Sequence, residues 1–159
     1  MDLNNLKDKV IIVEDFLPQS ECINLLQRVP VPYKVDNADL PWEHRTVNFK
    51  YHPSKDYVEK YWNTYFNVNH LKVLDAELTL WPIKSYSVRH IHDEADRIPM
   101  TYNSILYLND NFSGGEFFTD KVRLKPKPGT ITFFNGKETH HGLNQVQGHN
   151  RYCLIFWFN

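Results

Sequence analysis

The sequence has little of what would place the protein outside a reducing compartment or in a membrane. It holds two cysteines, Cys22 and Cys153, which are too few for a disulfide scaffold, so we expect a cytoplasmic protein. The chain begins Met-Asp-Leu-Asn-Asn-Leu-Lys, without the basic and then apolar stretch of a signal peptide. No apolar run approaches the roughly 20 residues that span a bilayer. We therefore expect no membrane partner.

An excess of charge of one sign is also lacking. The 18 Lys and Arg nearly balance the 19 Asp and Glu, for a formal net charge of −1. Nucleic-acid binding normally requires a concentrated basic surface. The one basic run, from Lys121 to Lys127, alternates with Val122 and Leu124, which predicts a half-buried strand whose charges are solvated. We expect no nucleic-acid partner.

The composition that is present suits one globular domain. Of 159 residues, 42% are hydrophobic and 14% aromatic, enough for a sizeable core but leaving little room for a second domain. There is no repeat, linker or low-complexity segment. The sequence predicts a single domain over residues 1–159, with helical support mostly at 17–70 and a β core mostly at 71–159.

Helices are expected only in the first half. A strand at Val10–Phe16 should precede a helix that Ser20 caps and Pro30 ends. A second helix is predicted from Ser54 to about Phe66. The segment from Val31 to His52 lacks clear periodicity and is interpreted as a loop, either beside a substrate or simply on the surface.

Short strands separated by turn signals follow residue 71. They are expected at Ala76–Pro82, Ser85–His92, Thr101–Leu108, Gly115–Thr119, Val122–Leu124, Thr130–Phe134 and Arg151–Phe158. Many short strands at this spacing predict a mainly β fold, a sandwich or jelly roll with helices outside.

Four of the eight histidines fall in two short stretches, His90-Ile91-His92-Asp93-Glu94 and His140-His141. Alternate residues of a strand share a face, so His90, His92 and Glu94 can point the same way. A His-x-carboxylate strand joined by a distant histidine has the geometry of a two-histidine, one-carboxylate site for Fe(II). Zinc uses the same ligand types, so the spacing does not identify the metal. The alternative without a metal is a set of ordinary surface histidines.

Arg151 opens the last predicted strand and shares a face with Cys153, Ile155 and Trp157. A buried arginine needs a carboxylate partner, because an unpaired charge away from water is costly. A ligand carboxylate could supply a bidentate partner. The alternative is an arginine at a strand end, in water.

From Trp81 to Phe158 the sequence resembles the prolyl 4-hydroxylase branch of the Fe(II)/2-oxoglutarate oxygenases. The segment from Val10 to Leu26 resembles the usual start of that family. The resembling pieces, in order, are Trp81-Pro82, the His90–Glu94 cluster, Ser104-Ile105-Leu106-Tyr107-Leu108-Asn109, Ser113-Gly114-Gly115-Glu116-Phe117-Phe118, Lys127-Pro128-Gly129, Phe133-Phe134, His141, Val146, Gly148, Arg151 and Phe156-Trp157-Phe158. The resemblance implies a double-stranded β-helix (jelly-roll) core with supporting N-terminal α-helices.

The resemblance also implies roles for single residues. His141 resembles the distal metal ligand, with Val146 and Arg151 at the family's usual offsets from it. Arg151 resembles the residue that binds the far carboxylate of 2-oxoglutarate, and Tyr107 resembles its hydroxyl-donating companion.

The sequence departs from the family pattern at the first metal pair. The register set by Trp81 places His90 first and His92 where the family carries its carboxylate. A shift by two residues gives His92 and Glu94, which we prefer, and a bulge at Asp93 is a third alternative. The predicted metal ligands are therefore His92, Glu94 and His141, with His90 and His92 as the alternative register. Trp81 stands where many relatives carry Tyr, so one hydrogen bond to the cosubstrate is expected to be missing.

The activity that the resemblance implies is hydroxylation of an unactivated C–H bond with Fe(II), 2-oxoglutarate and O2, supported by ascorbate, and with succinate and CO2 as co-products. A prolyl residue of a peptide or protein is the leading substrate by analogy, with a small molecule as the other substrate class. Two alternatives stay open. One is a three-histidine dioxygenase that does not use 2-oxoglutarate, and the other is a non-catalytic jelly-roll binding domain.

Overall fold

The computed structural model describes residues 2–29, 42–43, 45–93 and 99–159. Two α-helices and a short 3-10 helix accompany twelve strands in these ranges. The helices are η1 (Leu3–Asn5), α1 (Gln19–Leu26) and α2 (Lys55–Phe66). The strands are β1 (Ile11–Val13), β2 (Val47–Lys50), β3 (Val73–Trp81), β4 (Ser87–His90), β5 (Tyr102–Tyr107), β6 (Ser113–Gly114), β7 (Phe117–Thr119), β8 (Arg123–Leu124), β9 (Ile131–Asn135), β10 (His141–Leu143), β11 (Val146–Gln147) and β12 (Arg151–Phe158).

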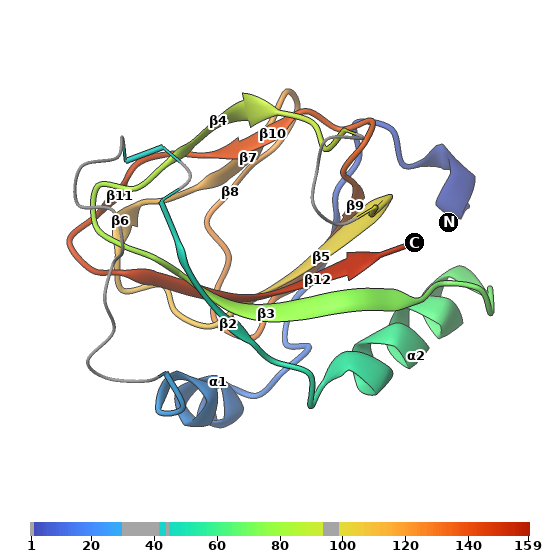
Figure 1. Cartoon of the computed structure of the whole chain (residues 1–159), viewed down its shortest axis with the longest axis horizontal. Coiled ribbons are helices and arrows are strands. Elements are labelled where there is room, and N and C mark those ends of the chain that lie inside the picture. The colour runs from blue at the N-terminus through green and yellow to red at the C-terminus, as the bar shows by residue number, and fades with distance from the viewer. Residues whose placement is uncertain (1, 30–41, 44, 94–98) are drawn as a thin grey trace.

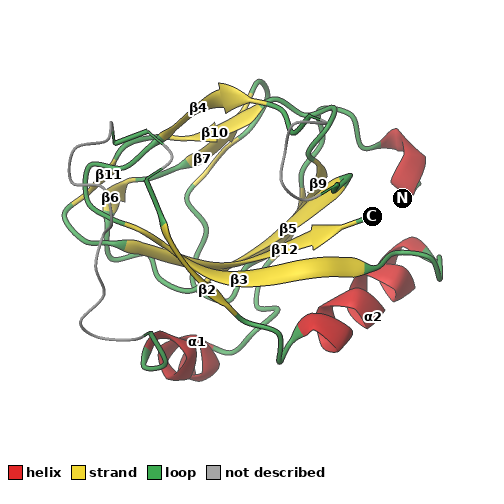
Figure 2. Ribbon diagram, viewed as in Figure 1, coloured by secondary structure: helices red, strands yellow, loops and turns green. Residues whose placement is uncertain are grey.

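Two antiparallel sheets face each other. The larger has six strands in the order β1-β9-β5-β12-β3-β2, and the smaller has four in the order β4-β10-β7-β8. A two-stranded ribbon, β11-β6, lies at one end. Helices α1 and α2 cover the outer face of the larger sheet, on the side away from the smaller one (Figures 1 and 2). This is the predicted mainly β architecture with N-terminal helices outside.

Strand β12 shows how the sequence produces these layers, because it is central in the larger sheet and alternate side chains serve opposite faces. Leu154, Phe156 and Phe158 are buried in the apolar core beneath the helices. Arg151 and Cys153 point to the opposite face and line the cavity between the sheets. The helices therefore stabilise the sheet, and the inner face is left for a site.

Three predictions about local structure were wrong. Helix α1 begins at Gln19, with Pro18 as its N-cap, so Ser20 lies inside the helix. The segment interpreted as a loop contains strand β2, whose Asn48 pairs with Thr79 of β3. Strand β4 ends at His90, so His92 lies in the loop that follows and not on the strand. Among the described residues, no helix is both long and apolar enough to cross a membrane.

Trp62 of α2 connects the helices to the sheet. It is fully buried, stacks near Phe66 and contacts the ring of Phe133 on β9. Its indole Nε1–H donates to the hydroxyl of Ser104 on β5 at 2.9 Å. The hydrogen bond satisfies the one polar group that the indole brings into the core.

Replacing Ser104 by Ala should lower the free energy of unfolding by about 1–3 kcal/mol, because the buried Trp62 N–H loses its acceptor. Urea denaturation followed by fluorescence measures this cost. The same replacement in a Trp62→Phe background should cost much less, since the donor is already gone. An equal cost in both backgrounds would show that the hydrogen bond contributes nothing.

Candidate metal and carboxylate site

A cavity of about 240 Å³ lies between the two sheets. Its polar lining is divided between the sheets. The smaller sheet contributes His90 and His141, and the loop after β4 contributes His92. The larger sheet contributes Arg151 together with Asn48, Glu77, Thr79 and Asn103. Phe117 and Phe134 also line it, and their ring centroids lie 6.1 and 4.8 Å from that of His141. The cavity therefore combines ligand-type side chains with apolar walls that exclude water.

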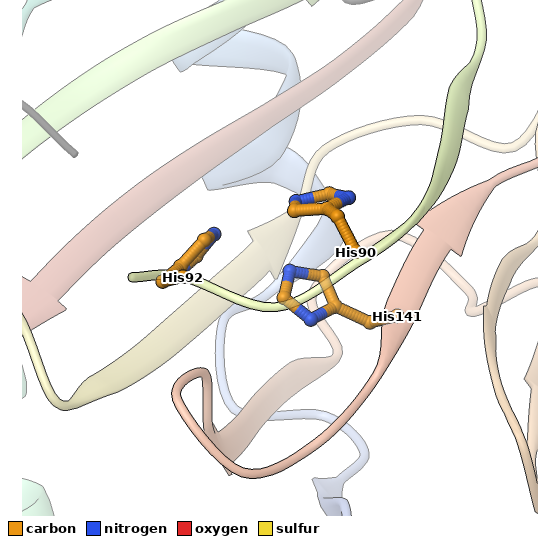
Figure 3. A group of neighbouring side chains, drawn as sticks. All are labelled: His90, His92 and His141. Carbon is orange, nitrogen blue, oxygen red and sulfur yellow. The ribbon is translucent and has the colours of Figure 1, made fainter. Parts of the chain in front are cut away.

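The three histidines form one cluster (Figure 3). His90 is the last residue of β4 and His141 the first of β10, and the antiparallel register makes them direct partners. His92 follows in the loop after β4 and faces both. One ring nitrogen from each lies within 4.8 Å of the others, close enough for a single metal ion after a small inward movement of the rings.

The approach of β4 to β10 depends on Gly142. A Cβ at this position would lie 2.5 Å from Phe118 Cζ and 2.7 Å from the carbonyl oxygen of Ser87. Those distances are well inside van der Waals contact, so only glycine lets the two strands come together here. The pairing of His90 with His141 follows from this close approach.

Backbone carbonyls fix the tautomers of two of the histidines. His141 Nδ1 lies 2.8 Å from the carbonyl oxygen of Thr139, and His90 Nδ1 lies 2.8 Å from that of Val88. A carbonyl only accepts, so in each ring Nδ1 carries the hydrogen and donates it. Nε2 is left with the lone pair that a metal ion requires.

Burial keeps His141 neutral. It is 6% exposed, and loss of hydration lowers its pKa from 6.5 to about 3, with the nearby His92 as the next cause. A metal ligand must be deprotonated at this nitrogen, so the site prepares His141 in the form that binds a cation.

Arg151 occupies another part of the cavity. It is 2% exposed, and no ion pair with it is found in the described part of the chain. Its Nη1 lies 3.6 Å from Cys153 Sγ, its Cζ lies 5.1 Å from the centre of the Tyr107 ring, and its Nε has no hydrogen-bond partner among the described residues. A buried guanidinium so poorly compensated suits an anionic ligand.

Two further buried donors lie beside Arg151. The hydroxyl of Tyr107 makes no hydrogen bond of normal geometry within the described ranges, and burial raises its pKa to about 12, so it stays protonated. Trp81 pairs with Arg151 in register and lines the cavity, and its Nε1–H likewise makes no hydrogen bond of normal geometry within the described ranges. From the sequence we expected one hydrogen bond to the cosubstrate to be missing, because Trp81 stands where many relatives carry Tyr. In the structure the indole N–H of Trp81 is itself a buried donor on the strand residue paired with Arg151. The clue missed from the sequence was this cross-strand register.

The predicted site residues are thus brought together in part. His92 and His141 lie in the histidine cluster, and Arg151 and Tyr107 lie side by side. His90, the alternative ligand, is in the cluster as well. Glu94 lies outside the described residues, so its role stays a prediction.

The low pKa of His141 predicts a pH dependence of stability for the metal-free protein. Below about pH 6.5 the unfolded chain takes up a proton that the folded chain refuses until about pH 3, so stability present above 6.5 is lost as the pH falls. From about pH 7 to about pH 5 the loss due to this group should be about 2 kcal/mol. Chemical denaturation should show it in wild type and in the exposed-histidine control His70→Gln, but not in His141→Gln. The same slope in all three would contradict the effect.

Comparison with known proteins shows which family the chain resembles. The sequence profile described as "2OG-Fe(II) oxygenase superfamily" matches residues 44–159. Prolyl 3-hydroxylase 2 of Rattus norvegicus and of Homo sapiens is 40% identical over 65 residues, which is 36% of this chain but 9% of the relative. The chain therefore matches only a small part of these longer proteins.

Solved structures show the same fold. A viral collagen prolyl hydroxylase from Paramecium Bursaria Chlorella virus-1, in complex with 2-oxoglutarate, has a TM-score of 0.72 and 20% identity, covering 94% of each chain. A Pseudomonas putida prolyl-4-hydroxylase has a TM-score of 0.66 and 18% identity, covering 94% of this chain and 91% of that one. HygX from Streptomyces hygroscopicus, solved with nickel, 2-oxoglutarate and hygromycin B, has a TM-score of 0.70 and 12% identity, with coverage of 98% and 84%. The predicted jelly-roll core is confirmed, and the chain belongs to the 2OG-Fe(II) oxygenase superfamily.

Proposed function

We propose that this chain is an Fe(II)- and 2-oxoglutarate-dependent dioxygenase that hydroxylates a prolyl residue of a peptide or protein, with succinate and CO2 as co-products. The observation that supports this proposal most strongly is that two kinds of binding group line the same cavity. It holds three clustered histidines and, elsewhere in its wall, a buried arginine with no ion pair in the described part of the chain. A metal ion and a dicarboxylate that chelates it would use both features at once.

For the metal we propose the ligands His90, His92 and His141, which is the alternative register of the sequence prediction. These residues supply three nitrogen donors, and their common site leaves room on the cavity side for other ligands. Because Nδ1 of His90 and of His141 faces a backbone carbonyl, Nε2 is the nitrogen that each ring would present to a divalent cation. Glu94 is the alternative to His90 as a metal ligand. The activities of Glu94→Ala and His90→Ala distinguish the two ligand sets.

For 2-oxoglutarate we propose that Arg151 pairs with the carboxylate far from the metal. Trp81 and Tyr107 each bring a buried donor to the same place, so the carboxylate would satisfy groups that are otherwise unpaired. Because Arg151 and Tyr107 are buried, pairing with them would be stronger than in water. The arrangement orients the cosubstrate before O2 arrives.

Bound Fe(II) would supply the activation of O2, coupled to oxidative decarboxylation of 2-oxoglutarate. The chain's own contribution is orientation and exclusion of water. The carbonyls of Thr139 and Val88 hold two imidazoles in the correct tautomer, and Phe117 and Phe134 form a dry wall beside His141. A dry wall protects reactive species from side reactions.

The choice of a prolyl substrate is supported by the prolyl hydroxylases among the relatives and neighbours. HygX, which has the same fold, was solved with the small molecule hygromycin B. A small molecule is therefore the other substrate class to test. Peptides containing proline and a panel of amines and sugars, each scored for added oxygen by mass spectrometry, separate the two.

Succinate production is expected from the wild-type chain with added Fe(II), ascorbate and 2-oxoglutarate. His90→Ala, His92→Ala and His141→Ala should each lose it, because each removes a metal ligand. Glu94→Ala should retain it. Loss in Glu94→Ala with retention in His90→Ala would restore the other register, and no succinate from wild type in long incubations would favour a binding domain.

Binding of 2-oxoglutarate should depend strongly on Arg151 and weakly on Trp81. Arg151→Gln should raise the dissociation constant by at least about thirtyfold, because it leaves a buried carboxylate unpaired. Trp81→Phe keeps the ring but deletes one donor and should raise it by about three- to tenfold. Calorimetry with Mn(II) in place of Fe(II) measures both. Unchanged affinity in Arg151→Gln would exclude the proposed cosubstrate site.

A further inference from the structure

Asn103 on β5 is a buried amide whose oxygen is not used. The residue is 2% exposed and lines the cavity that holds the histidines. Its Nδ2 contacts Met100 Sδ at 3.4 Å, while Oδ1 accepts no hydrogen bond from the described residues. A buried carbonyl oxygen without a hydrogen-bond partner is costly, so this one is expected to have a partner.

Gly136 shows what lies next to that oxygen. A Cβ at Gly136 would lie 2.3 Å from Asn103 Oδ1 and 2.6 Å from His92 Nδ1. Both atoms therefore converge on the same small space, and the missing side chain of Gly136 is what leaves it open. The amide oxygen and the imidazole nitrogen are neighbours across this glycine.

Main-chain hydrogen bonds connect the loop that carries His92 with Gly136, and Gly136 with Thr101 just before β5. The N–H of His92 donates to the carbonyl oxygen of Gly136 at 2.9 Å, and the N–H of Gly136 donates to that of Thr101 at 2.9 Å. The loop carrying His92 is thus tied to the end of β9, which is tied to the start of β5. Asn103 and His92 are held close by main-chain hydrogen bonds that do not depend on either side chain.

The other two histidines of the cluster each donate Nδ1–H to a backbone carbonyl. Metal-binding histidines generally have such a partner, which fixes the tautomer and raises the basicity of the ligating nitrogen. His92 lies in a loop beyond the end of β4, and its Nδ1 and Asn103 Oδ1 both border the space next to Gly136.

We propose that Asn103 is a positioning residue for the metal site, whose amide oxygen accepts the Nδ1–H of His92 and so presents His92 Nε2 to the metal. This rests on the proposed metal binding by His92. The contact of Nδ2 with Met100 orients the amide, because it directs the nitrogen to the sulfur and the oxygen to the other side. Asn103 would act through His92 without touching metal or cosubstrate.

The test compares metal affinity in three variants of the whole chain. Asn103→Leu keeps the volume and removes the acceptor, Asn103→Asp keeps an acceptor oxygen, and Thr79→Val deletes another buried polar group of the same cavity as a control. Co(II) is titrated into metal-free protein and followed by its visible absorption. Asn103→Leu should bind Co(II) about 10- to 100-fold more weakly, while Asn103→Asp and Thr79→Val should bind it as wild type does.

A second measurement starts from the wild type alone, so that the role of Asn103 can be tested even where a variant fails to fold. Nitrogen-15 NMR of the histidine rings in metal-free wild type, at about pH 8 and so above the ordinary histidine pKa, should find His92 as the Nδ1–H tautomer. Asn103→Leu should shift it toward the Nε2–H form. A wild-type His92 in the Nε2–H form, or unchanged Co(II) affinity in Asn103→Leu, would overturn the role of Asn103 and leave the metal site standing. Failure of wild type to bind Co(II) would instead overturn the proposed metal site itself.

Discussion

The antiparallel pairing of β4 with β10 is the constraint on which the site depends. It places His90 directly opposite His141, two histidines that are about fifty residues apart in the sequence. Because the pairing is antiparallel and β10 begins at His141, the chain beyond His90 has no partner strand. It turns away and hydrogen-bonds through His92 to Gly136, which brings a third imidazole to the other two. The third imidazole joins the cluster because β4 ends at His90 and the following loop turns toward Gly136.

The larger sheet supplies the other side of the cavity. Its strand β12 is buried on both faces, so alternate residues meet very different surroundings. One face contributes phenylalanines to the core under the helices, and the other carries Arg151 into the cavity. Burying a guanidinium without a partner is costly, so this half of the cavity favours an anionic ligand.

Much of this could be predicted from the sequence, since period-two alternation is a local signal. The strands after residue 71 and the face that Arg151 shares with Cys153 follow from it, and the second helix follows from the equally local helical period. The end of β4 could not be predicted, because a strand ends where its partner ends and β10 is distant in sequence. Strand β2 was missed because four residues, Val47–Lys50, are too few to reveal a period. The donor of Trp81 was undervalued because its importance depends on the cross-strand register with Arg151.

The proposed three-histidine ligand set would change the charge balance at the metal. A carboxylate ligand would reduce the positive charge at the metal, whereas three neutral imidazoles leave the full charge of a divalent ion for the cosubstrate to balance. The anionic 2-oxoglutarate would then be held between a cationic metal and Arg151. On this account the cosubstrate is part of the charge balance of the site as well as its reductant.

A crystal structure of the chain with Mn(II) and 2-oxoglutarate tests this account most directly. We predict metal bonds to Nε2 of His90, His92 and His141, with the far carboxylate of 2-oxoglutarate on Arg151. A structure in which Glu94 replaces one of the histidines, or in which the dicarboxylate lies away from Arg151, would contradict it.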